Sequence, residues 1–479
     1  MQSKFVFSII IFGLITLTSI NTIAQSRQQL KTDSIFQLVG QYLKTKDADA
    51  IYALAGDQFK KTLSPERFRS IATEQLFPLG EIRKTSLLSF INNKTATYKV
   101  QFEVLVMQVL ISLDENDKLD LFYFKPFKIE PVDKLVAVAT SNPMRSVQDK
   151  KVDSVARTYI QKINTVGLSI GVLKNGRVSL YNYGETTKGS GQLPTAETLF
   201  EIGSITKTFA AAILATYVNE GKIKLTDPVT KYLPDSIAAN PELKNVTIVN
   251  LINHTSGLPT LPANFADQKP YDPLNPYANY TKQLLFAYLK DCRLITKPGE
   301  KYAYSNLAVG LLGTILEQIS GKSFEEMASQ MVCNPLGMKN TLQHLYPLIK
   351  MRFAPVYNDN GQQTLPWDFN ALASCGALHS TVDDLLLYAR ANLNDNGVTP
   401  LAKALKLTHQ ITFTKEPKLG LAWHIILVNG INYYFHDGDT YGSSSFLAFN
   451  KEKNLAVIVL SNATASTVAL GVGILNKLQ

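Results

Sequence analysis

Cysteine, histidine and tryptophan are scarce in this sequence, which has three, six and two of them among 479 residues. The cysteines, Cys292, Cys333 and Cys375, are an odd and widely spaced set. A disulfide framework is therefore excluded, and three buried thiols are expected, with a single bridge as the alternative. No group of cysteines and histidines has the spacing of a zinc site, so no metal is predicted.

Charge is also limited. Charged residues make up 18% of the chain and hydrophobic residues 45%, with a formal net charge of +9 at pH 7. This composition excludes a disordered chain and is typical of a globular protein, for which this length predicts two or three domains. The positive charge is spread out and no nucleic-acid-binding motif accompanies it, so a basic solvated surface is expected. Loose attraction to anionic cell-envelope polymers is the alternative.

Long hydrophobic runs are absent except at the N-terminus, where residues 5–20 are almost wholly apolar. Lys4 precedes the run, and Thr22, Ile23 and Ala24 follow it as a cleavage region, so residues 1–25 are predicted to be a secretory signal peptide. A retained membrane anchor is the alternative, but the run is slightly short for one. We therefore expect a periplasmic or secreted protein with no stable membrane span after signal cleavage.

Residues 27–145 are predicted to form a small α+β domain. Helical patterns at 32–43, 48–59 and 64–76 are followed by β-rich segments at 95–113 and 118–129, with a turn at 114–117. Helices followed by a β-meander resemble the nuclear-transport-factor-two-like modules that accompany other secreted bacterial domains. No polar cluster there indicates an active site, so a binding or positioning role is expected.

A predicted linker at 133–147 leads to a larger domain at 148–479. The pattern predicts a helix and a hairpin turning at Asn175 and Gly176, then a mainly helical region, and finally strands with a closing helix. The expected helices are 149–163, one from 205 that stops at Gly221, 246–253, 306–319, one capped by Ser380, and 466–478. The expected strands are 166–174, 177–183, 420–428, 431–436, 444–450 and 455–461. The long loop at 260–280 is expected to line a cleft.

Ser204 and Lys207 form the only S-x-x-K of the chain, at the start of the helix that ends near Gly221. This spacing puts the hydroxyl and the amine on one helix face, about 5–6 Å apart at Cβ. A serine is a weak nucleophile until a base takes its proton, and a lysine whose pKa is lowered by burial can be that base. The helix N-terminus adds N–H groups for an oxyanion. Alone the motif is weak, and a capped surface helix with an exposed lysine is the alternative.

A second motif is Tyr304-Ser305-Asn306, which follows a turn at Pro298 and Gly299 and opens a helix. The phenol of Tyr304 can share or relay a proton, and the amide of Asn306 has a donor and an acceptor for a substrate amide. A second Tyr-x-Asn begins at Tyr277, so the tripeptide alone has little specificity.

The third motif is His436-Asp437-Gly438, followed by Asp439, at the end of a predicted strand. The glycine lets a substrate backbone lie close, and the strand edge can accept an extended acyl chain. A surface histidine at a turn is the alternative. His379 is expected to be structural.

Together, these three motifs in this order resemble the serine β-lactamase-like and penicillin-binding-protein superfamily, on its class C side. Further similar stretches are 167–172, 225–228 and 254–259, and the match covers roughly residues 148–479. The resemblance implies an α+β fold in which an antiparallel sheet is flanked by helices and carries a helical insertion. The nucleophilic serine would lie between the sheet and the insertion.

The resemblance also implies the role of each site residue. Ser204 would be the acylated nucleophile, Lys207 its proton acceptor, and Tyr304 the partner base that returns a proton to the leaving group. Asn306, Gly438 and Asp439 would contact the substrate, His436 would line the opposite wall, and the backbone N–H groups of Ser204 and Asp439 would form the oxyanion hole. The sequence leaves open whether Lys207 or Tyr304 is the primary base. No metal or organic cofactor is implied.

Two departures from the family pattern shape the functional prediction. His436 stands where β-lactamases and many carboxypeptidases have lysine, which favours a substrate carboxylate more strongly than a neutral histidine does. Asp439 adds a carboxylate that repels anionic substrates unless it is turned to solvent. We therefore expect a serine hydrolase, esterase or peptidase-like, that cleaves a small-molecule or peptide ester or amide, with cell-wall fragments among the candidates. The alternatives are a D-amino-acid peptidase or carboxypeptidase, a weak β-lactamase, and a binding or sensor protein that acylates without turnover.

Overall fold

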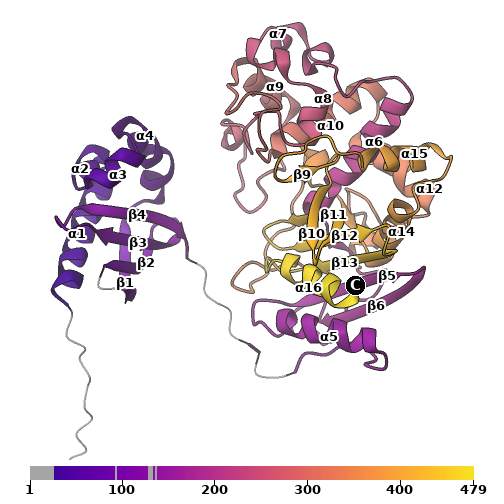
Figure 1. Ribbon diagram of the computed structural model, residues 1–479, viewed down its shortest axis with the longest axis horizontal. Helices are drawn as coiled ribbons and strands as arrows, with labels where there is room; N and C mark the ends of the chain where they lie inside the picture. Colours follow the sequence, from indigo (N-terminus) through magenta and orange to yellow (C-terminus); the bar gives the residue numbers. More distant parts are fainter. Residues whose placement is uncertain (1–25, 92–93, 128–132, 135–136) are drawn as a thin grey trace, which may run out of the picture. The chain divides into compact units, whose positions relative to one another are not determined.

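The computed structural model describes residues 26–91, 94–127, 133–134 and 137–479. The predicted signal peptide, residues 1–25, lies outside the described residues. The chain divides into two compact units, Met1–Glu130 and Pro131–Gln479 (Figure 1). Each unit has its own hydrophobic core.

The N-terminal unit packs helices on an antiparallel meander whose strand order is β1-β2-β3-β4. Phe36 and Tyr98 stack at 4.3 Å between ring centroids and join the first helix to the sheet. The helices are α1 (Arg27–Lys44), α2 (Ala48–Ala53), α3 (Asp57–Thr62) and α4 (Pro65–Ile71). The strands are β1 (Ile82–Ile91), β2 (Thr95–Phe102), β3 (Val106–Leu113) and β4 (Leu119–Pro126).

The sequence-based expectation and the structure differ at two places in this unit. The helix expected at 48–59 is broken into α2 and α3, because Gly56 has extended backbone and serves as the N-cap of α3. The edge strand β1 was not predicted, because most of its side chains are exposed and it lacks the alternation of a half-buried strand. The likeness of this unit to nuclear-transport-factor-two-like modules stays a prediction.

The larger unit is built on a seven-stranded antiparallel sheet of order β6-β5-β13-β12-β11-β10-β9. The predicted hairpin joins β5 to β6, with Asn175 and Gly176 at φ 51° and 79°. The strands of the sheet are β5 (Gly167–Lys174), β6 (Arg177–Gly184), β9 (Lys418–Leu419), β10 (His424–Val428), β11 (Ile431–Asp439), β12 (Ser444–Asn450) and β13 (Leu455–Ser461). A small pair, β7 (Phe200–Glu201) and β8 (His379–Ser380), lies apart from it.

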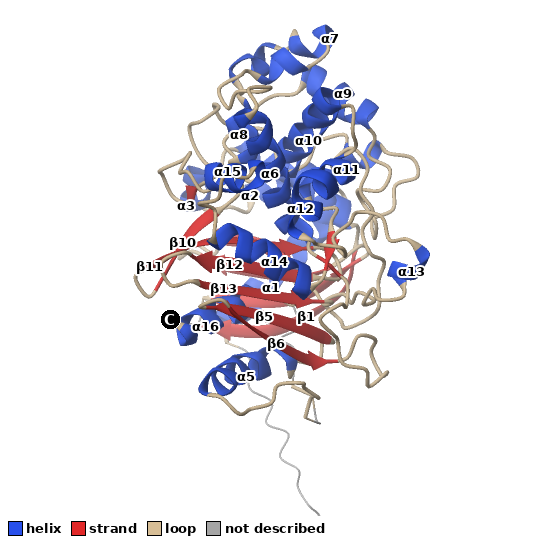
Figure 2. Cartoon of the chain, turned by 90° about the vertical axis from the view of Figure 1, so that its right-hand side faces the viewer, coloured by secondary structure: helices blue, strands red, loops and turns tan. Residues whose placement is uncertain are grey.

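Helices cover both faces of this sheet, which confirms the predicted α+β fold. Helices α5 (Val147–Ile160) and α16 (Val468–Leu478) pack on one face, and α14 (Val382–Leu393) packs on the other. The helical insertion lies beyond the β10 and β11 side of the sheet (Figure 2). The remaining helices are α6 (Thr206–Asn219), α7 (Asp235–Ala238), α8 (Ile248–Ile252), α9 (Lys282–Asp291), α10 (Asn306–Ser320), α11 (Phe324–Ala328), α12 (Asn334–Leu336), α13 (Pro347–Lys350) and α15 (Pro400–Thr408).

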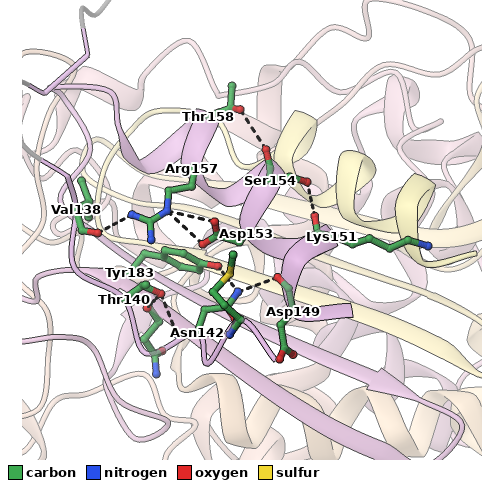
Figure 3. Close-up of polar contacts among 12 residues, drawn as sticks. Val138, Thr140, Asn142, Asp149, Lys151, Asp153, Ser154, Arg157, Thr158 and Tyr183 are labelled. Atoms are coloured by element: carbon green, nitrogen blue, oxygen red, sulfur yellow. Dashed lines mark hydrogen bonds and ion pairs between the residues drawn. The ribbon is translucent and has the colours of Figure 1, made fainter. Parts of the chain in front are cut away.

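The segment before α5, predicted to be a linker, docks on the larger unit in its described part. Arg157 donates to the carbonyl of Val138, and the Asn142 amide donates to the carbonyl of Asp149 and to the Tyr183 hydroxyl (Figure 3). Thr140 forms a β-bridge with Tyr183. Asp133 also forms a β-bridge with Lys162, and Lys134 donates to the carbonyl of Ile160, so the described part of the predicted linker belongs structurally to the larger unit.

Other details refine the predicted elements. The strand expected at 420–428 is regular only from His424, and α14 is capped by Thr381 rather than Ser380. Thr381 Oγ1 accepts from the Asp384 N–H, whereas the Ser380 hydroxyl contacts Thr341. All three cysteines are buried free thiols, as expected. Within the described ranges, no helix is long and apolar enough to cross a bilayer.

Candidate active site

Ser204 lies in a single 3₁₀ turn, Gly203–Ile205, between β7 and the N-terminus of α6. Gly203 enters the turn with φ 47°, a conformation that favours glycine. The side chains of α6 from Thr206 to Tyr217 are buried on every face, so this is a core helix rather than the alternative of a capped surface helix. The nucleophile candidate is thereby attached to the most buried helix of the unit.

Lys207 is fully buried beneath Ser204. Its Nζ lies 2.8 Å from Ser204 Oγ, 2.8 Å from Asn306 Oδ1 and 2.6 Å from the carbonyl oxygen of Cys375. Burial lowers the pKa of Lys207 to about 8, although the charge of Asp437 opposes this shift. A neutral amine can keep two N–H donors on Asn306 and Cys375, so that its lone pair faces the Ser204 hydroxyl. This geometry suits a general base.

Tyr304 approaches Ser204 from the loop before α10. Its hydroxyl donates to Ser204 Oγ at 2.7 Å, and its ring lies 4.9 Å from Lys207 Nζ. Burial raises the pKa of Tyr304. The hydrogen bond with Ser204 opposes this shift but does not cancel it. The phenol is therefore neutral at pH 7 and is a proton donor, which favours Lys207 over Tyr304 as the primary base. His254 packs on the Tyr304 ring at 4.3 Å between centroids.

Asn306 joins two sides of the site. Its Oδ1 accepts from Lys207, and its Nδ2 donates to the Tyr277 hydroxyl at 2.9 Å. Both ends of the amide thus have protein partners, and its most direct effect is to orient Lys207. Its predicted contact with a substrate amide stays a prediction.

Strand β11 passes directly behind the nucleophile turn. A Cβ placed on Gly438 would lie 2.6 Å from the Ser204 nitrogen, and one placed on Gly203 would lie 2.9 Å from the Asp439 nitrogen. Only glycine at these two positions permits the approach. The two backbone N–H groups that the family resemblance assigns to the oxyanion hole therefore meet at this contact.

His436 takes a different position from the one expected. It is 1% exposed and is not among the described lining residues of the pocket beside Ser204; its Nδ1 is 2.6 Å from the Asp437 carbonyl and its ring 5.5 Å from that of His424. Side chains alternate along β11, so Asp437 and Asp439 line the pocket while His436 does not. Burial lowers the pKa of His436 well below its usual value, which keeps the imidazole uncharged.

A pocket of about 410 Å³ opens above Ser204. It contains the expected Tyr304, Asn306, Gly438 and Asp439, together with further residues for which no role was predicted. These are Tyr277, Tyr302, Trp367, His424, Phe435 and Asp437. Tyr277 belongs to the loop at 260–280, which was expected to line a cleft, and its Tyr-x-Asn pattern could have indicated a site residue. No sequence pattern indicated Trp367.

Glu201 supports the pocket from below and was also missed. It is 4% exposed, and its carboxylate accepts from the Trp367 backbone N–H at 2.6 Å, from Thr440 Oγ1 at 2.6 Å and from Ser443 Oγ at 3.0 Å. Burial raises the pKa of Glu201, opposed by these three bonds. Glu201 therefore ties the Trp367 loop to the turn that follows β11.

Neither a metal site nor the cavity of the N-terminal unit is a comparable candidate among the described residues. Among the described residues, no group of three or more histidine, cysteine, aspartate or glutamate side chains is arranged to hold a metal ion. The N-terminal unit has a cavity of about 600 Å³ bordered by α1 and β1, but none of its described lining residues is a serine, cysteine or histidine. The cavity above Ser204 is thus the better candidate for covalent chemistry.

Comparison with known proteins agrees with this geometry. The sequence profile of the Beta-lactamase family matches residues 152–475. The chain is 27% identical over 344 residues to a beta-lactamase of Pseudomonas fluorescens, covering 65% of this chain and 92% of that protein. It is 29% identical over 287 residues to the D-alanyl-D-alanine-carboxypeptidase/endopeptidase AmpH of Escherichia coli K12, covering 57% of this chain and 72% of that protein.

Solved structures show the same fold. A class C beta-lactamase matches with a TM-score of 0.63 and 25% identity, covering 71% of this chain and 98% of that chain. A beta-lactamase/D-alanine carboxypeptidase from Pseudomonas syringae matches with a TM-score of 0.61 and 24% identity, covering 70% of this chain and 98% of that chain. With a family match across more than half of its length, the chain belongs to the beta-lactamase family and is a serine hydrolase of that superfamily.

Proposed function

We propose that this protein cleaves an ester or an amide through an acyl-enzyme on Ser204, as an esterase or a peptidase-like hydrolase. The observation that carries this proposal is the position of Ser204 Oγ, 2.8 Å from Lys207 Nζ and 2.7 Å from the Tyr304 hydroxyl. A buried amine and a phenol on one hydroxyl provide the base and the proton donor that acyl transfer needs.

The reaction proceeds in two halves. Neutral Lys207 takes the Ser204 proton as Oγ bonds to the carbonyl carbon, and the N–H groups at the Gly203–Gly438 contact stabilise the oxyanion. Tyr304 donates its own proton to the leaving atom and is reprotonated by the Lys207 ammonium, so the proton taken from Ser204 ends on Tyr304 and Lys207 is neutral again. Water then attacks the acyl carbon, and the serine is released.

The first test is labelling of the purified protein with a fluorophosphonate probe. We expect Ser204 to be labelled and Ser204→Ala to abolish labelling. The matched control is Ser190→Ala, at an exposed loop position outside the pocket. A folded protein that is not labelled would contradict the proposal, whereas labelling without turnover of any substrate would favour the binding or sensor alternative.

D-amino-acid carboxypeptidase activity is the second candidate, because one relative is named for it. A panel of short-chain esters, D-alanyl peptides and a chromogenic cephalosporin separates the candidates. Esterase activity without cleavage of the peptides or the cephalosporin would support the first reading. Preferential cleavage of D-alanyl peptides would support the second, and cephalosporin hydrolysis a weak β-lactamase.

We also propose a periplasmic or secreted location, supported by the signal-like pattern of residues 1–25. Fractionation of the native host and N-terminal sequencing of the mature protein test it. A protein recovered from the cytosol with residues 1–25 intact would contradict this location.

A further inference from the structure

The pocket above Ser204 has one acidic wall and one aromatic wall. Asp437 and Asp439 on β11 form the acidic wall. The aromatic wall consists of Tyr277 and Trp367, which pack against each other. The acidic wall contributes carboxylates and the aromatic wall contributes aromatic rings. Both border the space that a substrate must occupy to reach Ser204.

No described lining residue of this pocket is a lysine or an arginine. Lys207 lies behind Ser204 with its Nζ bonded to protein atoms, and it must be neutral to accept the serine proton. His424 is uncharged at neutral pH, because burial and the nearby Lys207 lower its pKa to about 4. The net charge facing the substrate is therefore negative.

Asp437 is the better buried of the two aspartates. Burial and then the charge of Asp439 raise its pKa to about 6, so the carboxylate is ionised at pH 7 but poorly stabilised. A substrate cation would relieve this repulsion, and a substrate carboxylate would add to it. The pocket therefore favours a positively charged substrate group over a negatively charged one.

The aromatic wall favours the same sign of charge. Trp367 lies 5.1 Å from Tyr277 and 4.8 Å from Tyr441 between ring centroids, so its neighbours form a cluster of electron-rich rings. Ring faces attract an ammonium group and give no comparable attraction to an anion. Carboxylate and aromatic ring together are a common environment for a bound amine.

We propose that the substrate carries an ammonium group close to its scissile ester or amide carbonyl, and that Asp437 is the residue that selects it. Asp437 and Ser204 line the same pocket, and the charge of Asp437 is near enough to the reacting groups to act on the pKa of Lys207. Aminoacyl esters and amides with a free α-amine have this arrangement. This inference rests on the proposed acyl-enzyme at Ser204.

The test uses p-nitroanilides of alanine, D and L, in three forms that differ only at the α-nitrogen: free amine, N-acetyl and N-succinyl. We expect the free amine to exceed the acetylated form by about tenfold or more in kcat/KM, with the succinylated form slowest. Succinyl substrates cleaved as fast as the free amine would overturn the proposal.

The variant Asp437→Asn tests whether Asp437 causes the preference for the free amine. We expect the ratio of kcat/KM between free-amine and acetylated substrates to fall toward one. Asp291→Asn, at an exposed position at the end of α9, is the matched control and keeps the wild-type ratio. An unchanged ratio in Asp437→Asn would overturn the role of Asp437, provided that fluorophosphonate labelling shows the variant to be folded.

A binding measurement covers the case in which no anilide is turned over. Alaninamide should slow fluorophosphonate labelling of Ser204 at about tenfold lower concentration than N-acetylalaninamide does, and Asp437→Asn should remove this difference. Equal protection by the two amides would overturn the inference. Absence of labelling in a folded protein would instead contradict the proposed acyl-enzyme itself, so the two failures are distinguishable.

Discussion

Lys207 shows how burial converts a common residue into a reactive one. An exposed lysine is cationic at neutral pH and cannot accept a proton, whereas this one has lost its hydration and has a pKa of about 8. Its two protein acceptors, Asn306 Oδ1 and the Cys375 carbonyl, also fix the direction of the amine. The two contacts therefore set the position of the amine, whereas burial sets its protonation state.

We predict that kcat/KM for an uncharged ester rises with pH through an inflection near 8, because only the neutral Lys207 amine takes the Ser204 proton. Below that pH the ammonium form predominates and the rate falls about tenfold per pH unit. Rates measured from about pH 5.5 to 9.5 test this.

The control is Lys290→Met, at an exposed position in α9, which should keep the inflection. A flat profile, or a rate that falls between pH 7 and 9, would show that Lys207 is not the base in the free enzyme.

The residues that could be predicted from the sequence are those whose spacing encodes their chemistry. Ser204 and Lys207 are one helical turn apart, so their proximity follows from local geometry, and Tyr304 was indicated by its setting before a helix. Trp367 and Glu201 could not be found, because their roles arise only when distant segments meet. For Asp437 the motif was visible, but whether the histidine or the aspartate faced the pocket depended on the alternation of β11.

At the scale of elements, the site depends on the contact between β11 and the Gly203–Ile205 turn. The Ser445 hydroxyl adds to it by donating to the carbonyl of Ile202, which belongs to the same turn region. The contact joins the sheet to α6 and sets the positions of the two predicted oxyanion donors.

We predict that Gly438→Ala reduces kcat/KM by about 100-fold, the usual cost of a displaced oxyanion donor. The new Cβ would lie 2.2 Å from the Ile202 carbonyl oxygen and 2.6 Å from the Ser204 nitrogen, both backbone atoms that cannot turn away. Ester hydrolysis and thermal melting measure the effect.

Gly40→Ala is the control, because its Cβ would meet only the end of the Ile82 side chain, at 3.4 Å, within helix α1. It should keep full activity and a melting temperature no lower than that of the wild type. Unaltered activity in Gly438→Ala would contradict the assigned contact.

Elements were predicted most accurately where burial gives a regular pattern. The strands β5, β12 and β13 and the helix α10 lie close to their predicted positions, because their apolar side chains are continuous or periodic. The boundaries were least accurate where the chain is held by tertiary contacts. Residues 138–146 resemble a linker in composition, yet side chains of α5 and β6 hold them in place.

At the scale of the whole molecule, the two units have separate cores, and the residues around Ser204 all come from the larger one. Because no residue of the N-terminal unit lines the described pocket, we expect the larger unit to perform the acylation without it.

We predict that a chain beginning at residue 133 folds and is labelled at Ser204. A chain beginning at residue 146 should melt roughly 5–10 °C lower, because it lacks the hydrogen bonds of Lys134, Val138, Thr140 and Asn142. Thermal melting and fluorophosphonate labelling of both chains test this. Equal melting temperatures would contradict the structural role of residues 133–145, and loss of labelling in the longer chain would show that the N-terminal unit is required.

The division between regular elements and loops within the pocket has an evolutionary consequence. Ser204 and Lys207 are held at the start of a core helix, whereas Tyr277 and Trp367 stand on long connections that tolerate insertion and exchange. Descendants of this scaffold can therefore acquire new substrate ranges by remodelling these two connections while the proton-transfer apparatus is inherited unaltered.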